Sequence, residues 1–80
     1  MPGNYDIAYD FADSDYGWVA FEGKIYGTQD GGRTWDNVGI LENVKQLNFV
    51  SKTHGWALIV ENSKTKFVRT LDGGHTWEPY

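Results

Sequence analysis

The stretch TQDGGRTW at residues 28–35 returns as TLDGGHTW at residues 70–77, with six of eight letters identical and a spacing of 42 residues. The paired glycines permit a positive φ, so the chain can reverse tightly within each copy. The aspartate of each copy, Asp30 or Asp72, can accept hydrogen bonds from backbone amides that such a turn leaves unpaired. We therefore interpret each copy as a turn that joins two strands, with its tryptophan covering the base of the hairpin.

The repetition extends upstream of these turns. The pattern Phe-x5-Gly-Trp at residues 11–18 returns at residues 49–56, a spacing of 38 residues. The second copy therefore holds four more residues between the Gly-Trp pair and the turn. They fall in ENSKTK at 61–66, opposite the shorter EGK at 22–24, where the residue types predict a hairpin loop. We expect the insertion to lengthen this loop and to leave the strands in register.

Each unit is predicted to contain four short strands and no helix. Alternation and turn residues place the strands of the first unit at YDIAYDF (5–11), WVAFE (18–22), KIYGT (24–28) and TWDNVGI (34–40). Those of the second unit are VKQLNFV (44–50), WALIV (56–60), KFVRT (66–70) and TWEPY (76–80). Four-stranded antiparallel units that repeat at about 40 residues are typical of β-propeller blades. We expect an all-β protein of two blades, residues 1–43 and 44–80.

The two turns resemble the Asp-box, also called the bacterial neuraminidase repeat, whose pattern is Ser/Thr-x-Asp-x-Gly-x-Thr-Trp. The matching positions are Thr28, Asp30, Gly32, Thr34 and Trp35, and then Thr70, Asp72, Gly74, Thr76 and Trp77. With GWVAFEGKIYGT and GWALIVENSKTKFVRT before them, the units are most similar to the blades of photosystem II assembly-factor-like propellers. The resemblance implies blade structure, with the boxes at the outer rim. It implies no enzymatic role, because Asp-boxes occur in proteins of many functions.

Composition excludes several classes of function. The net charge of −4 and seven Lys and Arg, none adjacent to another, argue against a nucleic-acid partner. No apolar run approaches the ~18–20 residues needed to cross a bilayer, so we expect no membrane insertion. The start MPGNYDIAYD lacks the basic and apolar regions of a secretory signal. The absence of cysteine excludes disulfides and thiolate metal sites, and it leaves the compartment unassigned.

The sequence contains no recognisable catalytic set. A sialidase needs several arginines around the substrate carboxylate, and this chain has only Arg33 and Arg69. His54 and His75 fall in predicted turns without a partner in a nucleophile motif. The acidic run DFADSD at 10–15 lacks the further ligands of an EF-hand loop, so we interpret it as a solvated turn. We expect no catalysis, no cofactor and no metal.

Aromatic residues make up 16% of the chain and supply the candidate interface or ligand surface. The residues that we single out for peptide docking or sugar stacking are Tyr16, Trp18, Tyr26, Trp56 and Tyr80. Trp18 and Trp56 hold equivalent positions in the repeat, which favours packing between successive blades over ligand binding.

Two blades cannot close a ring, because each terminal blade leaves a face exposed. One solution is a homo-oligomer with cyclic symmetry and heterologous contacts. The others are a longer propeller of which these residues are an excised fragment, and a compact pair closed by its own termini. We favour a non-catalytic binding or assembly scaffold that self-associates and recognises a protein partner. The alternative is a carbohydrate-binding module with a glycan ligand.

Overall fold

The computed structural model describes residues 7–80, which form strands and connecting turns without a helix. The strands are β1 (Ala8–Phe11), β2 (Gly17–Phe21), β3 (Lys24–Thr28), β4 (Asp36–Ile40), β5 (Val44–Phe49), β6 (Gly55–Glu61), β7 (Lys64–Thr70) and β8 (Glu78–Pro79). They make two four-stranded antiparallel sheets, β1-β2-β3-β4 and β5-β6-β7-β8. The expectation of an all-β fold with two such units is confirmed. Residues 5–6 of the first expected strand, and most of the N-terminal stretch tested for a signal, lie outside the described residues.

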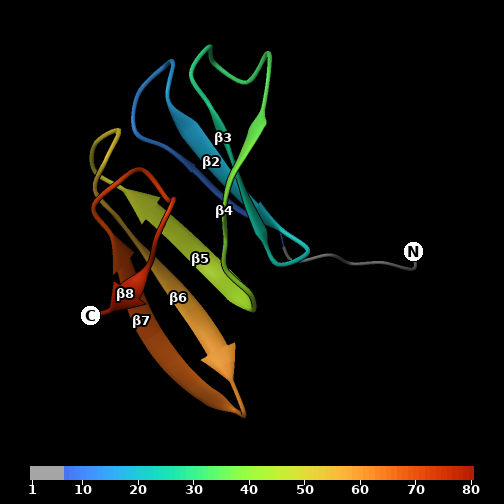
Figure 1. Ribbon diagram of the computed structural model, residues 1–80, viewed down its shortest axis with the longest axis vertical. Helices are drawn as coiled ribbons and strands as arrows, with labels where there is room; N and C mark the ends of the chain where they lie inside the picture. The colour runs from blue at the N-terminus through green and yellow to red at the C-terminus, as the bar shows by residue number, and fades with distance from the viewer. Residues whose placement is uncertain (1–6) are drawn as a thin grey trace.

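The two sheets follow one another along the chain and are joined by residues 41–43 (Figure 1). They contact each other through β1 and β5, and β2 also touches β5. Within each sheet every strand pairs with its neighbour in sequence, so the connections are short hairpins. No helix that could span a membrane occurs in the part of the chain from residue 7 to residue 80.

The hairpin insertion in the second sheet differs from what the sequence suggested. Strands β6 and β7 have seven residues each, whereas β2 and β3 have five. Both hairpins close with two residues at positive φ, Glu22-Gly23 in the first and Asn62-Ser63 in the second. The expectation of a longer loop is wrong, because the four extra residues extend the two strands equally. Two added residues per strand preserve both the two-residue turn and the period-two alternation, so each side chain keeps its face.

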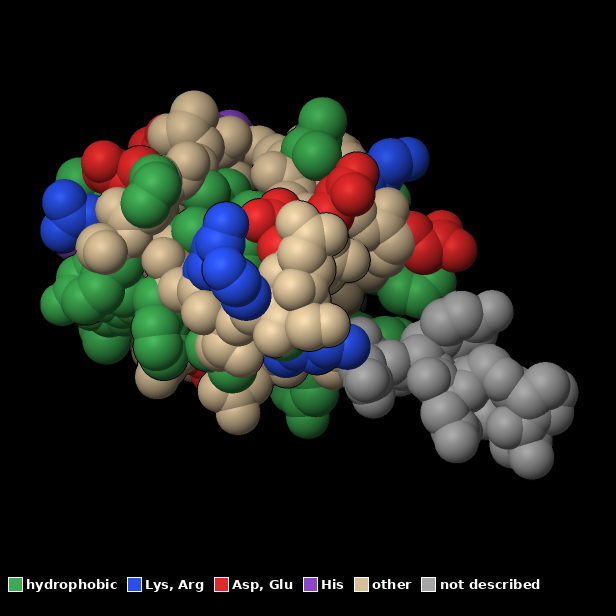
Figure 2. All heavy atoms as spheres, turned by 90° about the horizontal axis from the view of Figure 1, so that it is seen from below, with side chains coloured by type: hydrophobic (Ala, Val, Ile, Leu, Met, Phe, Trp, Pro, Cys, Tyr) green, Lys and Arg blue, Asp and Glu red, His purple; other side chains and the backbone are tan. Residues whose placement is uncertain are grey.

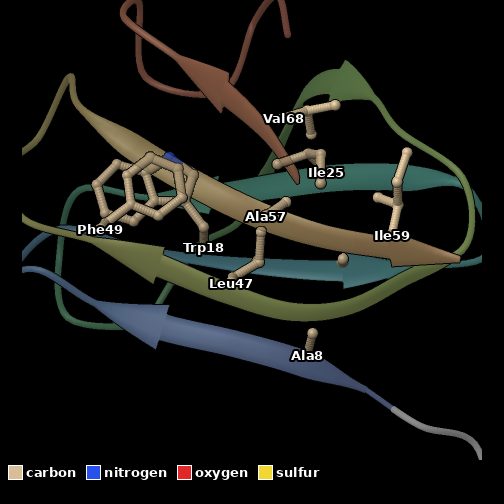
Figure 3. Packing of buried hydrophobic residues seen from close by; sticks show 9 residues of the cluster. Ala8, Trp18, Ile25, Leu47, Phe49, Ala57, Ile59 and Val68 are labelled. Atoms are coloured by element: carbon tan, nitrogen blue, oxygen red, sulfur yellow. The ribbon is translucent and has the colours of Figure 1, made fainter. Parts of the chain in front are cut away.

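The core lies between the two sheets. Its buried hydrophobic residues are Ala8, Trp18, Ala20, Ile25, Leu47, Phe49, Ala57, Ile59 and Val68. In β2 and β6 the inward residues alternate with outward ones, which is the pattern of a strand packed on one face. Figure 3 shows the Trp18 and Phe49 rings stacked at one end of this core, with smaller aliphatic side chains filling the rest.

Candidate functional site

The two repeated turns are closed by the same hydrogen bonds. The Asp30 carboxylate accepts from the Thr34 hydroxyl at 2.6 Å, from the Thr34 amide at 2.9 Å and from the Thr28 hydroxyl at 2.8 Å. Asp72 receives the corresponding three bonds from the two threonines of the second turn, at 2.6 to 3.0 Å. The first threonine of each turn is buried, and its hydroxyl oxygen accepts from the amide of the glycine four residues later. The polar residues of each repeated turn are therefore hydrogen-bonded to one another.

These bonds favour the ionised form of both aspartates. The hydrogen bonds from Thr34, and then from Thr28, lower the pKa of Asp30 to about 2. Burial alone would raise the pKa of Asp72, but the hydrogen bonds from Thr76 and Thr70 outweigh it and bring this pKa to about 2 as well. Both carboxylates are ionised near neutral pH and are engaged within their own turns.

Each sheet carries an aromatic pair beside its repeated turn. The Phe11 ring lies against Gly17, where a Cβ atom would come within 2.5 Å of it, and stands edge-on to Trp35 at 6.1 Å and 82°. Phe49 repeats the arrangement, at 6.0 Å and 84° from Trp77. Each of these two indoles donates to the carbonyl of the glycine three residues before it, at 2.9 and 3.0 Å. The two pairs are therefore held rigidly and in the same geometry.

In the second sheet this aromatic pair is covered by Trp18 of the first. The Trp18 ring stacks on Phe49 with 3.6 Å between centroids and 5° between planes (Figure 3). Its Nε1 donates to the Gly73 carbonyl of the second repeated turn at 2.8 Å. The structure thus places Trp18 in the contact between the sheets rather than at a free surface.

Asp10 supplies a second polar link across the same contact, and sequence reasoning missed it. Its carboxylate accepts from the backbone amide of Phe49 at 2.6 Å. The interpretation of residues 10–15 as a solvated turn is wrong for Asp10, which lies in β1. The available signal was strand alternation, which places Asp10 on the same side of β1 as the buried Ala8.

The outward side of the second sheet is an apolar surface, which we call the Trp56 face. It consists of Gln46, Asn48, Trp56, Leu58, Phe67 and Tyr80, and these residues line most of a hollow of about 330 Å³. Phe67 is 60% exposed and Tyr80 is 76% exposed. Trp56 is only partly buried here, although its repeat equivalent, Trp18, is buried in the core.

The outward side of the first sheet is also apolar, and we call it the Phe11 face. It consists of Tyr9, Phe11, Val19, Phe21, Tyr26 and Trp35, most of which line a hollow of about 290 Å³. Tyr9 is 67% exposed, and Phe11 and Trp35 also reach the surface. Hydrophobic side chains are visible at the surface in Figure 2, several of them together on the left of the view.

A third hollow of about 270 Å³ lies between the two sheets, beside the second repeated turn. Tyr16, Asp36, Lys52 and His75 are among its lining residues, and we call it the inter-sheet cleft. The Lys52 ammonium lies 5.7 Å from the centroid of the Tyr16 ring, in reach of a cation–π contact. The five aromatic candidates are therefore divided among the core, the cleft and the two outer faces, and they do not form one surface.

The acidic run beside the cleft holds a tight turn. Asp13 accepts from the backbone amides of Tyr16 and Asp15 at 2.8 Å each, and these bonds lower its pKa. Among residues 7–80, no cluster of three or more His, Cys, Asp or Glu could hold a metal ion. The Nδ1 atom of His54 lies 2.8 Å from the hydroxyl oxygen of Thr53, and His75 is an exposed residue at the cleft.

No protein-family model matches this chain, and no curated protein sequence matches it at a significant level. Among solved structures, a chain described as YCF48 bound to D1 peptide matches with a TM-score of 0.66 and 24% sequence identity. The match covers 99% of this chain and 27% of that one, so this chain spans about a quarter of the length of the protein it resembles. The expected likeness to photosystem II assembly-factor-like propellers is confirmed at the level of the fold, and the two sheets are built as β-propeller blades.

Proposed function

We propose that this chain is a non-catalytic binding and assembly module of the β-propeller type, with one blade in residues 1–43 and the other in residues 44–80. In this proposal the repeated turns are Asp-boxes, and the blades associate with further copies of the chain. The observation that carries the proposal is the pair of apolar outer faces, one on each sheet. Contiguous exposed apolar surface of this kind is typical of interaction sites, and propeller blades bury such faces against neighbours.

We further propose that the inter-sheet cleft binds a segment of a protein partner. Clefts between rigid elements are common ligand sites, and this one combines an aromatic ring, a cation and a carboxylate in Tyr16, Lys52 and Asp36. Such a set can hold both apolar and charged side chains of a peptide. The related fold of YCF48 was solved with a D1 peptide bound, which supports a peptide as the class of ligand.

Selection from a random-peptide display library, against the immobilised chain, tests the binding proposal. We expect enrichment of related peptides whose affinity falls at least tenfold in a Lys52→Ala or Tyr16→Ala variant, because both side chains line the cleft. The matched control is Leu71→Ala, an exposed apolar residue outside the cleft lining and both outer faces. Failure to enrich any peptide on a folded sample would contradict peptide binding.

A carbohydrate ligand is the second candidate, because Phe67 and Tyr80 expose aromatic rings on which a sugar could stack. A glycan array separates the two ligand classes. Binding to defined glycans that is lost in Tyr80→Ala, with no peptide enrichment, would favour the carbohydrate-binding module. Peptide enrichment together with a blank array would favour the protein ligand.

A further inference from the structure

We infer that Trp56 of one chain stacks on the Phe11–Trp35 pair of a second copy, so that chains associate head to tail through the Trp56 face and the Phe11 face. This inference rests on the proposed self-association and specifies its contact. It follows from the contact between the two sheets of one chain, because each outer face is the repeat equivalent of one side of that contact.

The Phe11–Trp35 pair is a preformed receptor for an indole ring. In the second sheet the equivalent pair, Phe49 and Trp77, stands at almost the same distance and angle and carries the Trp18 ring. Phe49 is 4% exposed beneath that ring, whereas Phe11 is 40% exposed. A receptor that already has its bound geometry loses little conformational freedom when a ring arrives.

Trp56 is the indole placed to fill such a receptor. Trp18 and Trp56 each follow a buried glycine at the start of the second strand of their sheet. Trp18 pairs across the hairpin with Gly27 and Trp56 with Arg69, at the same step from the strand end. Their indoles therefore project from equivalent positions, Trp18 toward the second sheet of its own chain and Trp56 away from it.

Both polar links of the contact within the chain also have counterparts at the outer faces. The Trp18 Nε1 donates to the Gly73 carbonyl, and the first repeated turn offers the Gly31 carbonyl at the equivalent position. The Asp10 carboxylate accepts from the Phe49 amide. Its equivalent on the Trp56 face is Asn48, whose amide oxygen can accept from the Phe11 amide of the next copy. Because Asn48 is neutral where the first sheet has Asp10, the interface between two acidic chains gains no carboxylate from this position.

The contact between copies has the register of the internal contact, but its other side chains are bulkier. Its side chains are larger than those of the internal contact on both sides. On the Trp56 face, Gln46, Leu58 and Phe67 stand where the first sheet buries Ala8, Ala20 and Ile25. On the Phe11 face, Tyr9, Val19 and Tyr26 stand where the second sheet buries Leu47, Ala57 and Val68. Close-packed interiors do not absorb such added volume, so the facing sheets of two copies open away from the indole stack, at which the internal spacing is kept.

Each chain would then offer one indole and one receptor, on opposite outer faces. Such a contact is heterologous, and it continues from copy to copy until the rotation closes a ring. Two variants separate the roles. Trp56→Ala removes the indole and keeps the receptor, whereas Tyr9→Glu places a charge on the Phe11 face and keeps the indole. Tyr9 is an exposed residue of the edge strand β1, so its replacement leaves the core intact.

Light scattering coupled to size exclusion, over a range of concentrations, tests the inference. We expect a multi-chain mass for the wild type, and at least tenfold weaker association for each variant alone. An equimolar mixture of the two variants should form a two-chain species and nothing larger, because only one productive contact remains. Leu71→Ala is the matched control and should keep the wild-type mass. If circular dichroism shows that Trp56→Ala is unfolded, Phe67→Glu takes its place. It puts a charge on the Trp56 face at a more exposed position.

The possible outcomes are distinguishable. A wild type that assembles with a mass unaffected by Trp56→Ala overturns the indole contact and leaves self-association standing. Variants that both dissociate but do not combine in the mixture overturn the head-to-tail pairing. A wild type that stays monomeric at its highest soluble concentration overturns self-association together with this inference, while the peptide-binding proposal is decided separately by display.

Discussion

At the scale of single residues, the hydrogen bonds within the repeated turns could be predicted from their residue types. The contacts between the sheets could not be predicted in this way. Thr28, Asp30 and Thr34 lie within seven residues of one another, so turn chemistry alone predicts their bonding. Asp10 bonds to an amide 39 residues away, and no local pattern contains that partner. The sequence therefore predicts the hydrogen bonds of side chains whose partners are close in the chain. It does not predict those whose partners depend on how the two sheets pack.

The two turn aspartates predict how stability depends on pH. Their folded-state pKa of about 2 lies below the ordinary aspartate value of 3.8, so the folded state binds protons less readily than the unfolded chain. The stabilisation is fully present above about pH 4 and is lost as the pH falls through about 2. We expect the melting temperature to fall over this interval, and to fall less steeply in the double variant Asp30→Asn, Asp72→Asn. That variant should also melt lower at pH 7. Identical slopes in the two proteins would contradict this assignment.

At the scale of elements, the repeat predicted all eight strands, and the largest error was in one hairpin. Strands β4 and β8 also begin two residues later than expected, at Asp36 and Glu78. Asn62 and Ser63 are typical loop residues, so the surrounding ENSKTK suggested a longer loop. Asn62 tolerates the left-handed conformation better than most residues, and with Ser63 it forms a two-residue turn between longer strands. Composition does not distinguish a long loop from a tight turn when the residues suit both.

The tight turn predicts a stabilising substitution. Ser63 adopts a positive φ, which costs a residue with a Cβ more than it costs glycine. Ser63→Gly creates an Asn-Gly turn, and we expect it to raise the free energy of unfolding by about 1 kcal/mol. Urea denaturation provides the measurement, with Ser63→Ala as the control that keeps the Cβ and should gain nothing. Equal effects of glycine and alanine would show that the backbone conformation is not the cause.

At the scale of the whole molecule, the two blades depend on each other through a contact made from small and close-packed groups. Gly39 of β4 lies so near the Gly74 carbonyl that a Cβ there would overlap it. The Trp18 ring fills the space above Phe49, and Ala8 and Ala57 let the sheets approach. A chain of 80 residues by itself has little stability in reserve, so this single core must support both sheets. We therefore expect the blades to unfold together as one cooperative unit.

The matched aromatic pairs provide the test of that dependence. Phe49→Ala removes a buried ring from the contact and should cost about 3–5 kcal/mol, a large part of the stability of such a domain. Phe11→Ala removes the equivalent ring from an exposed face and should cost clearly less in a background kept monomeric by Trp56→Ala, because Phe11 covers no core there. Urea denaturation followed by circular dichroism and by tryptophan fluorescence measures both changes, and coincident transitions would show joint unfolding. Equal costs for the two substitutions, or separate transitions for the two probes, would mean that each blade is stabilised by its own hairpins and that the contact between them is secondary.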